Sequence, residues 1–331
     1  MGQSLNFNNK GKNNFTLVRI CLAFIVLTGH GIALMATKDY LFVSIASGIA
    51  VYSFFGISGF LLNNSIMATT PKTFIVKRFA RILPGFYSNL IIVALVMYPI
   101  SNLLTRQNYS LVKSIKYIIQ NSLLYPFNQS IEGALQFSPR YESWNNSVWT
   151  LSFEFLCYLS LVIFSTLLKS RLSLVFALIV LLQFVLMQID PSIIVDKFRT
   201  LMELSSYFFI GVAMSAKKYK LIFGFLLIEV LFSTFESNPG FMLVVMAVVS
   251  IGNSRAIIEI KNDLSYGIYL YHFPIFQMIY NYQVFKGIRV NFFLAFCVTT
   301  LISTAISYAS WKKIEKPAID LAKNYREFAN E

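Results

Sequence analysis

Apolar runs long enough to cross a membrane recur along this whole chain. Seven reach the roughly 17 residues that a membrane-spanning helix needs: Val18–Leu34, Leu41–Leu62, Phe86–Leu103, Val148–Leu168, Leu172–Ile189, Leu264–Tyr282 and Phe292–Trp311. Three are shorter, and they either extend into polar neighbours or include a re-entrant segment: Leu204–Ala216, Leu221–Phe235 and Phe241–Ile251. The pattern predicts an all-α, polytopic membrane helix bundle of about ten transmembrane helices, with nine or eleven as alternatives.

The charged residues favour a membrane protein over a soluble one. They make up 13% of the chain, whereas soluble domains contain about 25%. A net charge of +13 would also suit a nucleic-acid-binding protein, but the Lys and Arg residues lie mostly between the apolar runs. That distribution follows the positive-inside rule. It predicts both termini in the cytoplasm and no nucleic-acid partner.

The chain is expected to form a single membrane domain over residues 1–331, without an appended soluble domain. The longest connection, Thr105 to Ser147, is predicted to lie on the outer side of the membrane. Its segment YSLVKSIKYIIQNSLL has apolar residues at helical spacing, which favours an amphipathic helix at the interface. The segment WKKIEKP at 311–317 is predicted to stop the last helix and anchor it at the interface.

Arg19 and His30 stand at opposite ends of the first apolar run. Their spacing of eleven residues places both on nearly one helix face, roughly 16 Å apart along the axis. An ionisable residue inside a bilayer is costly and indicates function. A neutral imidazole in a dry site can act as a general base, so His30 is a candidate catalytic residue. The alternatives are an interhelical hydrogen bond for His30 and a topology marker for Arg19.

Arg78 and Arg81 lie at the predicted cytoplasmic entry to the third span. Residues three apart share a helix face, and two guanidiniums on one face suit phosphate groups. Together with Arg19 they predict a cytoplasmic phosphate site. Simple positive-inside charge is the alternative.

The segment WTLSFE at 149–154 opens the fourth span from the predicted outer side. Glu154 lies about 7.5 Å deeper in the membrane than Trp149. A carboxylate at that depth is costly unless it has a partner or a functional role. His30 reaches a similar depth from the other side, so this geometry allows a His30–Glu154 pair in which Glu154 orients His30 or stabilises its imidazolium. Trp149 and Ser152 are predicted to line the same site.

The segment SYGIYLYH at 265–272 adds Tyr271 and His272 to the residues expected to line the site. His272 falls near the middle of the predicted ninth span. The sequence leaves open whether its role is functional or structural.

These segments, in this order, resemble the acyltransferase-3 family of integral membrane acyltransferases. The matching segments are Arg19-x10-His30, FFGISGFLL (54–62), RFARILP (78–84), WTLSFE (149–154), SYGIYLYH (265–272) and IEKP (314–317). Each is weakly specific alone, but together they cover residues 15–317. Many members carry Asp three residues before the first-span Arg, where this chain has Thr16. A capping or Arg-pairing role is therefore expected to be altered or moved.

The resemblance implies an O-acyltransferase that moves an acyl group, usually acetyl, from cytoplasmic acyl-CoA to a hydroxyl of a carbohydrate or lipid-linked glycan. It implies that acetyl-CoA is the donor, without a metal, and that His30 is catalytic. It also implies that Arg19 supports His30 or the donor and that Arg78 and Arg81 lie near the CoA phosphates. The implied setting is a bacterial inner membrane, with a lipopolysaccharide O-antigen or capsule as the acceptor.

Two other functions remain as alternatives. A transporter or flippase of a lipid-linked sugar would be built from internal repeats, and none stands out. A lipid-directed membrane O-acyltransferase would pair its intramembrane His with an upstream Asn or Asp, which is not evident here.

Overall fold

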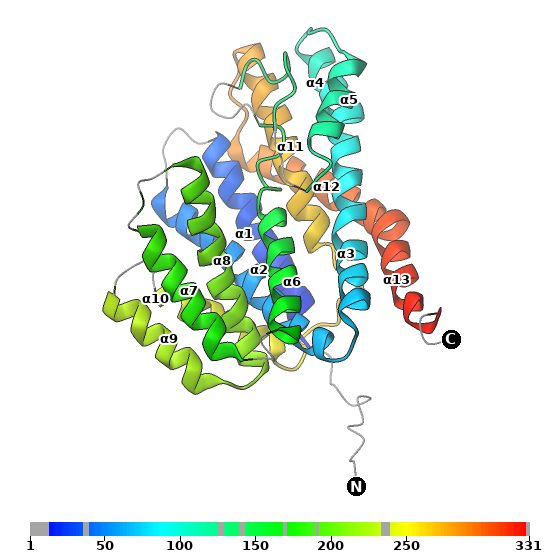
Figure 1. The fold of residues 1–331 in the computed structure, drawn as a ribbon. Coiled ribbons are helices and arrows are strands. Elements are labelled where there is room, and N and C mark those ends of the chain that lie inside the picture. The colour runs from blue at the N-terminus through cyan, green and yellow to red at the C-terminus, as the bar shows by residue number, and fades with distance from the viewer. Residues whose placement is uncertain are drawn as a thin grey trace.

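The computed structural model describes residues 13–35, 40–124, 129–138, 143–167, 171–187, 189, 192–232 and 239–328. Within these residues the fold is helical, and the only β-type pairing is an isolated bridge between Asn13 and Arg255. The α-helices, shown in Figure 1, are α1 (Phe15–Met35), α2 (Leu41–Met67), α3 (Pro71–Ile92), α4 (Tyr98–Leu104), α5 (Leu111–Gln120), α6 (Thr150–Thr166), α7 (Leu172–Met187), α8 (Ile193–Ser215), α9 (Tyr219–Phe232), α10 (Pro239–Asn253), α11 (Ser265–Lys286), α12 (Phe292–Ser310) and α13 (Lys316–Phe328). The all-α prediction is confirmed.

Each predicted span falls on a helix, although Leu168 and the residues 188 and 233–235 lie outside the described part of the chain. By length and composition, the described residues include four helices able to cross a membrane: Phe15–Met35, Leu41–Met67, Pro71–Leu104 and Phe292–Asn324. The described helices therefore agree with a membrane protein, but these criteria identify four spans among them, and the predicted count of about ten is not confirmed. Of the three shorter predicted spans, Leu204–Ala216 extends into polar residues, because it forms part of α8, which has 23 residues. The other two remain short, since α9 has 14 residues and α10 has 15.

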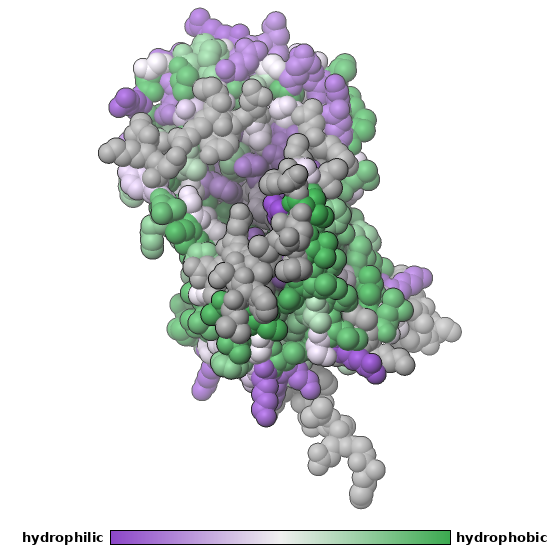
Figure 2. Space-filling view, turned by 60° about the vertical axis from the view of Figure 1, so that its left-hand side comes forward, coloured by the Kyte–Doolittle hydropathy of each residue, from purple (hydrophilic) through white to green (hydrophobic). Residues whose placement is uncertain are grey.

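The surface agrees with a membrane environment. Figure 2 shows hydrophobic residues gathered around the middle of the molecule and hydrophilic residues gathered at its two ends. The start of α1 and the whole of α13 lie toward the lower end in Figure 1, and α5 lies at the upper end. The predicted amphipathic helix is therefore present as α5, with Val112 and Ile119 exposed and Tyr117 buried.

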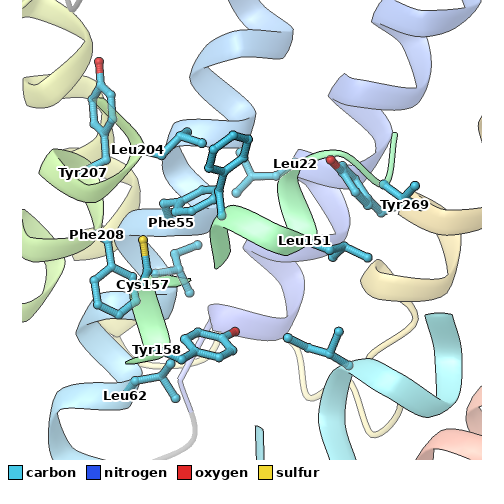
Figure 3. Packing of buried hydrophobic residues seen from close by; sticks show 14 of the residues in the cluster. Leu22, Phe55, Leu62, Leu151, Cys157, Tyr158, Leu204, Tyr207, Phe208 and Tyr269 are labelled. Carbon is cyan, nitrogen blue, oxygen red and sulfur yellow. The ribbon is translucent and has the colours of Figure 1, made fainter. Parts of the chain in front are cut away.

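Close backbone contact joins α2 to α8. A Cβ atom on Gly59 would lie 1.9 Å from the carbonyl oxygen of Phe208, and one on Gly211 would lie 2.0 Å from that of Gly56. Small residues that let two backbones approach are typical of helix pairs in membranes. Beside this contact, Figure 3 shows Cys157 of α6 among apolar side chains from α2 and α8. These helices form one wall of the bundle.

Helix α11 is largely buried in the bundle and contains several buried polar residues. Every residue from 268 to 277 is buried, including His272 and Gln277. Because these polar groups face protein rather than lipid, α11 is tolerated in the bundle although its sequence is less apolar than that of the four candidate spans.

The connection before α6 packs into the bundle: Trp144 is fully buried, and Gln277 of α11 accepts a hydrogen bond from Ser138 (2.9 Å) and donates one to the Ser143 carbonyl (2.8 Å). Figure 1 shows this segment descending along the bundle to an α6 that begins well below the upper end.

The prediction that WKKIEKP stops the last helix is wrong. It continues through a π-helical turn, Trp311–Glu315, into α13. Pro317 follows this turn within the continuous helix, where a proline has no N–H to donate to the preceding turn.

Candidate active site

A shared carboxylate joins three segments at one end of the bundle. Asp263, just before α11, accepts hydrogen bonds at Oδ2 from Arg19 of α1 and Arg81 of α3, each 2.8 Å long. Its Oδ1 accepts from the hydroxyl (2.5 Å) and the backbone N–H (3.2 Å) of Ser265. Burial alone would raise the pKa of Asp263, but the two guanidiniums and Ser265 override it and hold that pKa at about 2. Asp263 is therefore a fixed anion that positions both arginines.

Arg81 is also enclosed on its other sides. Its guanidinium carbon lies 5.4 Å from the ring centre of Trp311 and 5.7 Å from that of Tyr266. Its second terminal nitrogen lies 3.9 Å from a carboxylate oxygen of Glu315, which is buried. The π-helical turn carries both Trp311 and Glu315 and presents them to Arg81. Such turns inside α-helices are frequent at functional sites.

Arg78 differs from Arg81 although it stands one turn away on the same helix. Its buried Nε has no hydrogen-bond partner among the described residues, and no carboxylate of those residues forms an ion pair with it. Its guanidinium carbon lies 5.5 Å from the ring centre of Phe74, and Glu154 and Arg19 are among its electrostatic neighbours. The sequence grouped Arg78 with Arg81, but the structure leaves Arg78 as the guanidinium free to meet an added anion.

Glu154 belongs to this arginine cluster and not to His30. It accepts a hydrogen bond from Ser58 of α2 (3.2 Å) and a short one from Tyr158, one turn further along α6. Glu154 and Arg19 line one cavity of about 50 Å³. No hydrogen bond joins His30 to Glu154 in the described structure, so the proposed pair does not form. The reason is the connection that enters the bundle, which starts α6 deeper than the sequence suggested.

His30 instead meets His272 of α11. Its Nδ1 lies 2.7 Å from Nε2 of His272, and the two ring planes differ by 11°. Nδ1 of His272 lies 2.9 Å from the Ile268 carbonyl oxygen. His272 is fully buried, whereas His30 keeps part of its surface exposed. The edge of Phe273 closes on His30 with ring centres 5.2 Å apart.

The other residues expected to line the site have local partners. Ser152 donates to the Trp149 carbonyl (3.0 Å), and the Trp149 ring packs edge-on against Phe153. Neither residue lines the cavity that holds Glu154. Tyr271 is fully buried and donates to Ser88 of α3 (3.0 Å).

The sequence analysis missed Asp263. One indication was available: Thr16 stands where many family members carry an acid, so Arg19 needed a partner from elsewhere. The carboxylate directly before SYGIYLYH supplies it. Tyr158 and Ser58, which hold Glu154, could not be identified because their contacts depend on the register between helices.

Comparison with known proteins identifies the family of the chain. Residues 12–235 match the acyltransferase domain of the acyltransferase-3 family. The chain is 25% identical over 329 residues to an O-acetyl transferase of Shigella phage Sf6, covering 92% of this chain and 95% of that protein. It is 26% identical over 373 residues to nodulation protein 10 of Rhizobium leguminosarum bv. viciae, covering 97% of each. No solved structure matches the chain.

The family match spans more than half of the 331 residues and includes Arg19, His30, Arg78, Arg81 and Glu154. The two relatives align over nearly the whole length. Four apolar helices in the described part of this chain are long enough to cross a membrane. The chain therefore belongs to the acyltransferase-3 family and is a membrane acyltransferase.

Proposed function

We propose that this enzyme transfers an acyl group, in the first instance acetyl, from acyl-CoA to a hydroxyl of a surface carbohydrate or a lipid-linked glycan. The printed name of the phage Sf6 relative, O-acetyl transferase, supports the choice of acetyl. The observation that carries the proposal is His30, a half-buried residue eleven residues along α1 from an arginine cluster. A base within one helix length of a phosphate-binding group suits a donor that has a phosphorylated head and a long arm.

Arg78 is the residue proposed to bind a CoA phosphate. A guanidinium without a carboxylate partner can bind an incoming anion without breaking an existing ion pair. Arg19 and Arg81 are already held by Asp263, so their proposed part is to shape the site and add positive potential. Glu154 is proposed to hold the same cluster through its position beside Arg19.

The proposed reaction uses His30 as the general base. The acceptor hydroxyl oxygen attacks the thioester carbonyl carbon while His30 takes the hydroxyl proton. The new ester C–O bond forms, the C–S bond breaks, and the CoA thiolate takes the proton back from His30. The proposed orientation places the arginine cluster and both termini on the cytoplasmic side, where acyl-CoA is made, in a bacterial inner membrane.

Mass spectrometry of surface glycans tests the proposal. Cells that carry the chain should show glycans heavier by one acetyl group in place of a hydrogen, and cells with His30→Ala should not. Cys21→Ala is the matched control, because Cys21 is an exposed residue of the same helix. An unchanged acyl content in the His30→Ala cells, at equal protein level in the membrane, would refute the assignment of His30.

Purified enzyme in liposomes, given labelled acetyl-CoA and isolated glycan, tests the donor. Labelled glycan is the expected product. Movement of glycan across the bilayer without labelling would instead support a transporter.

A further inference from the structure

The hydrogen bonds around His272 define where its proton lies. Nδ1 of His272 is 2.9 Å from the Ile268 carbonyl oxygen, one turn earlier in α11. A carbonyl oxygen only accepts hydrogen bonds, so Nδ1 is the protonated nitrogen. In a neutral imidazole the other nitrogen then carries a lone pair. Nε2 of His272 is therefore an acceptor.

That acceptor faces His30. Nδ1 of His30 lies 2.7 Å from it, and the ring centres are 5.0 Å apart. The distance between the ring centres equals the distance between the two nitrogens plus the centre-to-nitrogen distance within each ring. The two ring centres and the two nitrogens therefore lie on one line. It follows that the hydrogen bond lies in the ring planes and that the rings are not stacked face to face. Since two lone pairs cannot form a hydrogen bond, Nδ1 of His30 is the donor. Nε2 of His30 is left with a lone pair.

We infer that His272 is a positioning residue that fixes the tautomer of His30 and so presents Nε2 of His30 as the base. This inference rests on the proposed function for its catalytic meaning. In the reaction, Nε2 of His30 takes the hydroxyl proton and later returns that same proton to the thiolate. His272 keeps its own proton throughout and continues to accept from Nδ1 of the His30 imidazolium. It fills the orienting place that a carboxylate holds in hydrolase triads, without adding a negative charge.

The surroundings make a purely structural role for the pair a poor explanation. The helices α1, α11 and α12 contribute a cluster of buried apolar residues beside this pair: Ala23, Leu27, Leu34, Ile268, Phe273, Phe276 and Ala295. A Cβ atom on Gly31 would lie 2.5 Å from Phe276, so α1 and α11 are already in tight contact. Two apolar side chains would hold this interface at lower desolvation cost than two imidazoles. The tight contact also keeps the two rings in register.

Nitrogen NMR tests the inference directly. The chain contains two histidines, so labelling with ¹⁵N-histidine marks this pair alone, and in a His272 variant only His30 remains. The full-length protein is measured in detergent at mildly alkaline pH, where imidazoles are neutral. We expect His30 to be protonated at Nδ1 and unprotonated at Nε2 in the wild type. The opposite tautomer in the wild type would overturn the inference without any variant.

Two substitutions then separate positioning from packing. In His272→Gln, the amide oxygen can accept at the place of Nε2, so we expect His30 to keep its tautomer and most of kcat. His272→Met has similar volume but no comparable acceptor, so we expect loss of the fixed tautomer and a fall in kcat of about 10²-fold or more, with KM for acetyl-CoA unchanged. Equal kcat in the two variants, or the same His30 tautomer in both, would refute the inference. If the expected tautomers are found but no glycan is acylated, the proposed function fails and the assignment of the tautomer stands.

Discussion

Replacement of Asp263 by Asn should destabilise the protein by a measurable and pH-dependent amount. The pKa of Asp263 is about 2 in the folded protein, against about 3.9 in an unfolded chain. A difference of about two pKa units corresponds to about 2.5 kcal/mol of folding free energy at neutral pH. Asn also removes the carboxylate that Arg19 and Arg81 share and leaves Arg81 only its longer contact with Glu315 (3.9 Å), so we expect a loss of about 2–4 kcal/mol.

The sign of the pH dependence follows from the depressed pKa. The unfolded chain takes up a proton at Asp263 before the folded protein does. The stabilisation is therefore fully present above about pH 4 and is lost as the pH falls from about 4 to about 2. In Asp263→Asn this component is absent, so the difference in stability between the two proteins should shrink toward the acid end.

Thermal unfolding in detergent, followed by circular dichroism from neutral pH down to about pH 2, measures both effects. Asp196→Asn is the control, because Asp196 pairs with Arg199 (3.2 Å) on an exposed surface with 59% of its side chain accessible. Exposed pairs contribute about 0–1 kcal/mol, so the control should follow the wild type. If the curves of Asp263→Asn and the wild type stay parallel down to about pH 2, the shared carboxylate does not stabilise the fold in this way.

Three further outcomes are expected. Arg78→Ala should raise KM for acetyl-CoA about tenfold or more while the melting temperature stays near wild type, whereas Arg81→Ala should lower the melting temperature. Steady-state kinetics and thermal unfolding measure the two effects, and the reverse pattern would contradict the proposed roles of the two arginines. Gly59→Ala should destabilise by about 3 kcal/mol or more because its Cβ would meet a backbone carbonyl at 1.9 Å, whereas Gly48→Ala, with its nearest neighbour at 4.0 Å, should be neutral in the same unfolding assay. Glu154→Gln should keep kcat within about tenfold of wild type, since Glu154 does not contact His30. A fall in kcat near 10²-fold in a kinetic assay would instead indicate that Glu154 takes part in the proton transfer.

The positions of the helices could be predicted because they depend on local properties. The length of each apolar run and the spacing of polar residues identified the cores of α1 to α3, α11 and α12. The depth at which α6 begins could not be predicted in this way. It depends on polar contacts such as Ser138 to Gln277 and on a hydrogen bond between Asn145 and Asn89, which hold the preceding connection inside the bundle.

The same distinction explains the site. Arg19, His30, Arg78 and Arg81 were identifiable because isolated polar groups in apolar helices are costly. Their partners were not, because each partner comes from a different helix whose register the sequence does not state.

Arg19 receives its anion from a segment far away in the sequence, because Thr16, one turn before it on α1, carries no charge. An arginine at the edge of a membrane helix needs an anion close by, but that anion can come from any segment that reaches it. Asp263 reaches Arg19 and Arg81 at 2.8 Å each. Because Asp263 pairs with both arginines, it ties α1 and α3 to the start of α11. The helix it anchors carries His272, so the ion pair at one end of α11 and the imidazole pair further along it both fix α11 against α1. The arginine cluster and His30 are therefore both tied to the same helix, α11.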